Sequence, residues 1–88
     1  MRWTEECKRC LQAFGKTDTD VQQERKSAPW KVAIAAHLKT TTQASNHWLS
    51  ERLRMGSAVA VSQYVGQLRR AGGDGRKWLE RLTEILKT

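Results

Sequence analysis

The sequence lacks the long apolar runs that mark membrane-spanning or secreted chains. No stretch of the 88 residues approaches the roughly 20 apolar residues of a membrane span. No apolar segment follows the first residues, as a secretory signal would require. We therefore expect a soluble, cytoplasmic protein that has no membrane partner.

Side chains that bind metals or perform catalysis are also scarce. Cys7 and Cys10 form a lone C-x-x-C, and His37 and His47 stand ten residues apart. A structural zinc site needs about four ligands, and a redox-active C-x-x-C needs an adjacent strand. We interpret the cysteines as two reduced thiols on a helix, and we expect no metal and no cofactor. Because no serine–histidine–aspartate set, phosphate-binding glycine loop or carboxylate cluster is present, the sequence predicts no enzyme.

Acidic residues are scarce through the middle of the chain. Residues 25–77 carry ten basic and two acidic groups, for a net charge of +8. Residues 1–24 carry −1 and residues 78–88 carry zero, so the middle segment accounts for the formal net charge of +7. A block this one-sided indicates a polyanionic partner, and the alternative is a well-solvated surface.

Apolar residues recur at helical spacing nearly throughout, and no run alternates apolar and polar residues convincingly. We expect one compact all-α domain of five or six helices over residues 1–88. Six helices are expected, at about 4–14, 18–26, 29–42, 43–54, 57–70 and 76–87. The third of them ends in the threonines at 40–42. This third helix is apolar nearly all round, which predicts a central position, with His37 in the core. Thr42 is expected to cap the fourth, and AGGDG at 71–75 to form a flexible joint.

Two stretches with apolar residues at helical spacing are joined at MGS within residues 48–70, WLSERLRMGSAVAVSQYVGQLRR. Ser50 is a small residue where the two helices would touch, and Met55 and Gly56 supply a turn. Val61 then begins the inner stripe of the second helix. The sequence therefore predicts a helix-turn-helix within a core at about 28–70. A packed helix pair without a ligand is the alternative.

The outer face of the helix at 57–70 contains no acidic residue. Glutamine can bond adenine, arginine can bond guanine, and a valine methyl can contact the thymine methyl. In the major groove of double-stranded DNA we expect base contacts from Val59, Ser62, Gln63, Gln67 and Arg70. Phosphate contacts are expected from Lys39, Thr41, Thr42, Arg52, Arg54, Ser57, Ala58 and Arg69. Gly66, on the same face, would let the backbone approach the duplex.

The segment at 25–65 resembles the C-terminal DNA-binding region of REP-associated tyrosine transposases. Its sequence is RKSAPWKVAIAAHLKTTTQASNHWLSERLRMGSAVAVSQYV. The shared positions are Arg25, Lys26, Pro29, Lys31, Ile34, Ala35, Leu38, Thr41, Thr42, Trp48, Leu49, Glu51, Arg52, Leu53, Met55, Gly56, Val61 and Ser62. The resemblance covers about residues 10–70 and implies a DNA-binding helix-turn-helix. Such transposases cut DNA with a tyrosine and a histidine pair. This sequence lacks that pair, and Tyr64 falls on an inner helix face, so the resemblance implies a module without the catalytic domain. A stand-alone domain, a remnant and a fragment are the alternatives.

The helix at 76–87 has an apolar face that either completes the core or forms a homodimer interface. Its members are Trp78, Leu79, Leu82, Ile85 and Leu86. The alternative function is that of a small helical adaptor or inhibitor that docks through this helix. If the chain binds DNA, we expect it to associate with the nucleoid. Its affinity for DNA would then fall steeply as the salt concentration rises.

Overall fold

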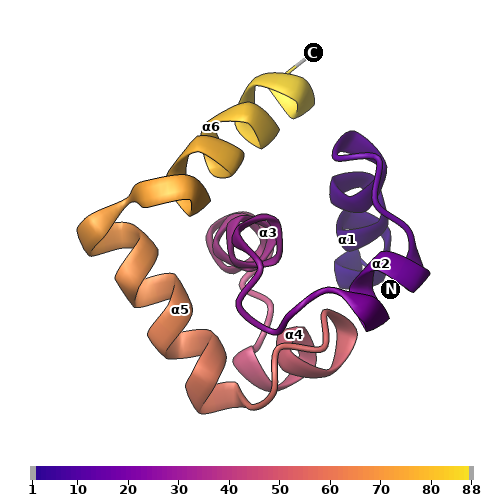
Figure 1. Ribbon diagram of the computed structural model, residues 1–88. Helices are drawn as coiled ribbons and strands as arrows, with labels where there is room; N and C mark the ends of the chain where they lie inside the picture. The colour runs from indigo at the N-terminus through magenta and orange to yellow at the C-terminus, as the bar shows by residue number, and fades with distance from the viewer. Residues whose placement is uncertain (1, 88) are drawn as a thin grey trace.

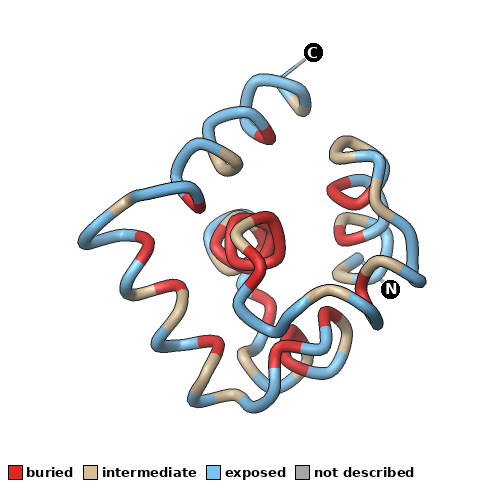
Figure 2. Tube along the Cα trace, in the orientation of Figure 1, coloured by how far each residue is buried: buried red, intermediate tan, exposed pale blue. Residues whose placement is uncertain are grey.

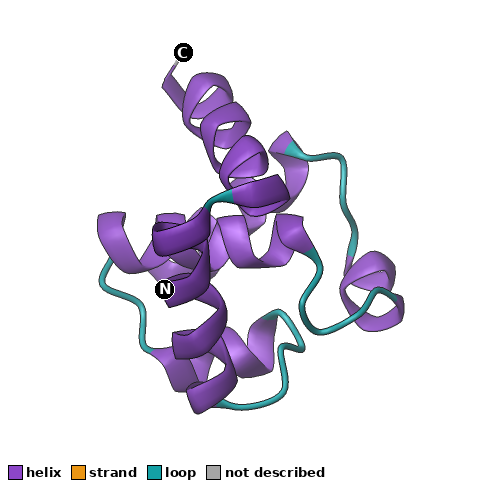
Figure 3. Ribbon diagram, turned by 60° about the vertical axis from the view of Figure 1, so that its left-hand side comes forward, coloured by secondary structure: helices purple, strands orange, loops and turns teal. Residues whose placement is uncertain are grey.

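The structure is a computed structural model that describes residues 2–87, and this part of the chain contains six helices and no strand (Figure 3). The helices are α1 Arg2–Ala13, α2 Asp18–Gln23, α3 Pro29–Thr41, α4 Asn46–Arg52, α5 Ala58–Ala71 and α6 Gly73–Lys87. The prediction of an all-α domain with five or six helices is confirmed. None of the helices described is long and apolar enough to cross a membrane.

The central element is α3, which Figure 1 shows end-on with α1, α4, α5 and α6 around it. Every residue from Trp30 to Ala36 is buried, as is Leu38, and Figure 2 shows this concentration of buried residues. Pro29 stands at the start of the helix, where its missing N–H removes no helical hydrogen bond. The alanines within α3 let α1, α5 and α6 pack closely on different sides of it.

The apolar face of α6 closes the core against α1 and α3. Leu82 is completely buried. Trp78 packs edge-on against Phe14, which follows α1, with ring centroids 4.8 Å apart. Trp78 and Leu79 are half-buried, so most of the apolar face predicted for this helix is used within the chain.

The expectation of a flexible joint at 71–75 is wrong. Only Gly72 lies between α5 and α6, with φ of +79°, and the three residues after it already belong to α6. Gly75 is buried, and a Cβ built on it would lie 2.8 Å from Cδ1 of Leu68. Gly75 therefore permits a close approach of α6 to α5, and Gly72 supplies the positive φ of the turn between them.

Other helix boundaries also differ from the sequence prediction: α1 begins at Arg2 instead of about Thr4, and α4 spans Asn46–Arg52 instead of about 43–54. Ser45, and not Thr42, caps α4, because the Ser45 side chain accepts a hydrogen bond from the Trp48 N–H at 3.1 Å. The Thr42 hydroxyl instead donates to the Leu38 carbonyl at 2.7 Å, and Thr42 is the C-cap residue of α3. α2 ends earlier than predicted, at Gln23.

Candidate nucleic-acid interface

Helices α4 and α5 pack against each other and are joined by residues 53–57. Leu49, Met55 and Val61 are completely buried and hold the pair on the core. Arg54 has a φ of +54° and Gly56 a φ of +103°, so the chain reverses at these two residues. The two helices and the turn thus occupy the segment for which the sequence predicts a helix-turn-helix.

The orientation of α5 is set at its first residues and along its inner side. The Ser57 side chain accepts a hydrogen bond from the Ala60 N–H at 3.1 Å, which caps the helix. Val61, Val65 and Leu68 are buried along one stripe. Because these three residues face the core, the opposite face of α5 points outward.

The five residues predicted to contact bases are all exposed. They are Val59, Ser62, Gln63, Gln67 and Arg70. Val59 is 67% exposed, the highest value among the large apolar side chains described. No acidic residue occurs in α5. Near the far end of this face, the Arg70 side chain folds back over Gly66, so that a Cβ built on Gly66 would lie 3.3 Å from Nη1. The outer face of α5 is therefore open, uncharged at its start and cationic at its end.

The residues predicted to contact phosphates fall into two groups. Thr41, Arg54, Ser57 and Arg69 are exposed, whereas Lys39, Thr42, Arg52 and Ala58 are half-buried. In the second group, Lys39 Nζ donates to Oδ1 of Asn46 and so joins α3 to α4. Arg52 Nη2 lies 3.2 Å from Oδ1 of Asp18. Both cations thus have partners within the protein.

Two hollows bring exposed cations to opposite ends of α5. Arg69 lines a hollow of about 300 Å³ together with Thr41 and His37. Arg54 lines another, of about 470 Å³, together with Lys26 and Glu51 beside the turn. The structure therefore brings Thr41 close to Arg69, and it separates this pair from Arg54.

Lys26 is a candidate contact residue that the sequence analysis did not select. Its side chain packs on the turn, so that a Cβ on Gly56 would lie 3.3 Å from Cδ of Lys26. Lys26 is exposed and lines the same hollow as Arg54. Its position in the basic pair before Pro29 was the available signal, but the sequence does not show that this pair meets a turn thirty residues later.

Lys31 belongs to the basic block but adds no charge to the surface, because it is completely buried. Its Nζ donates to the carbonyls of Val21 at 2.7 Å and Glu24 at 3.0 Å. Burial lowers the pKa of Lys31, while the Glu24 carboxylate acts in the opposite direction. This lysine therefore ends α2 and is not available to a phosphate.

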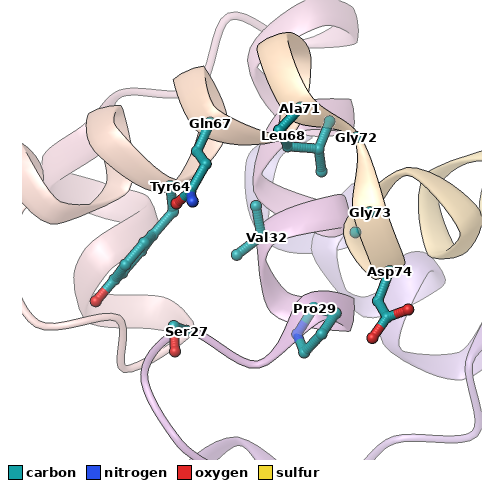
Figure 4. A pocket seen from close by; sticks show the side chains of 11 residues that line it. Ser27, Pro29, Val32, Tyr64, Gln67, Leu68, Ala71, Gly72, Gly73 and Asp74 are labelled. Carbon is teal, nitrogen blue, oxygen red and sulfur yellow. The ribbon is translucent and has the colours of Figure 1, made fainter.

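A third hollow, of about 440 Å³, runs along the side of α5 that faces the starts of α3 and α6 (Figure 4). Tyr64 and Gln67 line it from α5, and Val32 lies at its floor. Tyr64 is half-buried here, so it lies at the edge of the core. Asp74 borders the same hollow, which brings a carboxylate to the side of α5 that carries Gln67.

The thiols of Cys7 and Cys10 are completely buried and free. Burial is the main cause that raises the pKa of Cys7 to about 11 and that of Cys10 to about 12. Both thiols are therefore protonated near neutral pH and unreactive. Within residues 2–87, no three metal-ligating side chains gather.

Comparisons of the chain with models of protein families, with curated proteins and with solved structures found no match.

Proposed function

We propose that this chain is a DNA-binding module that inserts α5 into the major groove of a duplex. The observation that carries the proposal is the acid-free outer face of α5, on which all five predicted base-contacting residues are exposed. A major groove about 12 Å wide admits an α-helix, and the glutamine, arginine and valine side chains match the groups displayed there. The buried stripe of α5 fixes this face relative to α4, as a helix-turn-helix requires.

Phosphates on either side of the groove are contacted from the two ends of α5. Lys26 and Arg54 approach one strand beside the turn, together with the Ser57 and Ala58 backbone at the helix start. Arg69 and Thr41 approach the other strand. These contacts position the helix without reading sequence. Lys39 and Arg52 contribute less, because each has a protein partner.

Under this proposal the chain recognises DNA in the nucleoid and does not catalyse a reaction. The resemblance of residues 25–65 to the C-terminal region of REP-associated tyrosine transposases supports this role, since that region would recognise DNA. Under this proposal the chain is a transposase-like binding module, and Tyr64 serves packing.

The packing of the apolar face of α6 on the core disfavours the alternative of an adaptor that docks through this helix. Leu82 is inaccessible and Trp78 contacts Phe14, so the docking face would have to leave the core first. The same burial leaves Ile85, at 39%, as the one exposed member of the predicted homodimer face within the described chain. Both the adaptor role and the homodimer stay predictions.

A salt titration with a fluorescent random-sequence duplex tests the proposal. Affinity should fall by tenfold or more between about 50 and 200 mM salt. Arg70→Ala should weaken binding, and Ile85→Asp, on α6, should leave it unchanged. Leu82→Asp is unsuitable for this comparison, because a charge at that buried position would unfold the protein. Absence of duplex binding at low salt, or an effect of Ile85→Asp larger than that of Arg70→Ala, would overturn the proposal.

A further inference from the structure

Resting on the proposed function, we infer that α5 reads a site of about four base pairs through Val59, Gln63 and Arg70, in that order. Val59 contacts a thymine methyl, Gln63 bonds an adenine, and the Arg70 guanidinium bonds a guanine. The other two exposed residues, Ser62 and Gln67, lie to either side of this stripe and are not assigned a base.

Val59 is the first member of the stripe. It lies in the first turn of α5, where helix-turn-helix proteins contact base edges. Its side chain is 67% exposed, so the core of this chain does not require it. The Ser57 cap fixes the direction of the first turn and therefore of the Val59 methyl groups. An apolar group held outward at this place matches the methyl group of thymine.

Gln63 and Arg70 continue the stripe at helical spacing. Gln63 follows Val59 by four residues, which places both on one side of the helix. Arg70 stands further along, but its guanidinium folds back to the level of Gly66. The gap at Gly66 therefore brings the charged group nearer to the other two base contacts than its position in the sequence suggests.

The spacing of the contacts follows from helix geometry. A helix rises about 1.5 Å per residue, so Gln63 lies about 6 Å beyond Val59, and Gly66 about 10 Å beyond it. Base pairs along the groove are about 3.4 Å apart. With α5 lying along the groove, the adenine is about two base pairs from the thymine, and the guanine about three.

Gln67 is excluded from the readout by its surroundings. It lines the hollow that Asp74 also borders, whereas none of the three stripe residues lines this hollow. Gln67 therefore stands to one side of the stripe and is assigned no base.

The test begins with selection of bound sequences from a pool of random duplexes. The expected winner contains the thymine, adenine and guanine at the spacing above. In the synthetic winner, each thymine is then replaced by deoxyuridine, which removes only the methyl group. One replacement should lower wild-type affinity about fourfold, the value of one buried methyl group. Val59→Ala should show the same loss on the thymine duplex and no response to deoxyuridine.

The guanine contact is tested in the same duplex with 7-deazaguanine, which removes one hydrogen-bond acceptor. About three base pairs from the thymine, this change should weaken wild-type binding about fivefold. Arg70→Ala should not respond to it. Ile85→Ala removes an exposed aliphatic side chain from α6 and is the matched control; it should respond to both base changes as the wild type does. Circular dichroism verifies that each variant is folded.

The outcomes separate this inference from the proposed function. Salt-dependent duplex binding with no response to deoxyuridine at any position would overturn the inference and leave DNA binding intact. A response that persists in Val59→Ala would also overturn it, because the methyl contact would then belong to another residue. If no duplex is bound even at low salt, both the inference and the proposed function fail.

Discussion

The guanidinium of Arg70 occupies the space above Gly66, so that a Cβ on Gly66 would lie 3.3 Å from Nη1 of Arg70. The two residues are one helical turn apart, and side chains on a helix lean toward its N-terminus. The glycine was expected from the sequence to let the backbone approach a duplex. In the structure it makes room for the arginine that the proposal directs to a guanine.

Gly66→Ala should therefore stabilise the protein and weaken sequence-specific binding. Gly66 does not have a positive φ, so alanine fits the helix and should add about 1 kcal/mol to the free energy of unfolding. The new methyl group displaces the guanidinium, which should reduce affinity for the selected duplex by up to about fivefold. Thermal unfolding and fluorescence anisotropy measure the two effects.

Thr19→Ala is the control for this pair of effects, since it raises helix propensity at an exposed position in α2. It should leave DNA affinity unchanged. If Gly66→Ala stabilises the protein and binds the selected duplex as tightly as the wild type, the gap has no role in placing Arg70.

Lys31→Met should destabilise the protein without changing its interaction with DNA. The methionine keeps the apolar stem but leaves the carbonyls of Val21 and Glu24 without the ammonium group that they bind. Each buried acceptor left unsatisfied costs about 1–3 kcal/mol. Urea unfolding measures the loss, and Lys77→Met, at an exposed position, should change stability by less than about 0.5 kcal/mol. A stability equal to that of the wild type would show that water replaces the ammonium group.

Most of the helices could be predicted because they carry an apolar stripe whose burial follows from its period, whereas α3 is apolar nearly all round and α2 has one buried residue, Val21. Their ends could not be predicted as well, because a hydroxyl that can accept from the N–H groups of one helix can instead donate to a carbonyl of the helix before it. Thr42 and Ser45 are both suitable caps for α4 by residue type. The carbonyl of Leu38 takes the Thr42 hydroxyl, and Ser45 caps α4 instead. Gly75 illustrates the same limit, since its contact with Leu68 explains the glycine at this position and is not visible in the sequence.

The exposed face of α5 followed from its period, but the charges around it did not. Arg52 was expected to contact phosphate, yet it pairs with Asp18, far away in the sequence. Lys26 was not selected, yet it packs on Gly56. Counting charges along a sequence gives the total of the basic block. Which of those charges reach the surface depends on contacts between distant segments.

The free energy of unfolding should decrease as pH falls through the titration of His37. This side chain is half-buried on α3, and its burial lowers its pKa below the usual 6.5. The charges of Glu6, which raises the pKa, and Arg9, which lowers it, have smaller effects than burial. The unfolded chain therefore takes up a proton at a higher pH than the folded chain does. Stability is present above about pH 6.5 and is lost as pH falls through the folded-state pKa. His37→Gln should lose less stability than the wild type between about pH 7 and 5, measured by urea unfolding. An equal loss in both proteins would assign the pH dependence to other groups.

Lys26 and Arg54 should each contribute the same amount to DNA affinity whatever the sequence of the duplex. Each is exposed beside the turn, and each is expected to neutralise one phosphate. Replacing either by alanine should therefore reduce the slope of log affinity against log salt by about one, with the same loss on the selected and random duplexes. Lys87→Ala, at the exposed end of α6, is the matched control and should leave the slope unchanged. A loss confined to the selected duplex would mean that these side chains read bases, and an unchanged slope would remove the turn from the interface.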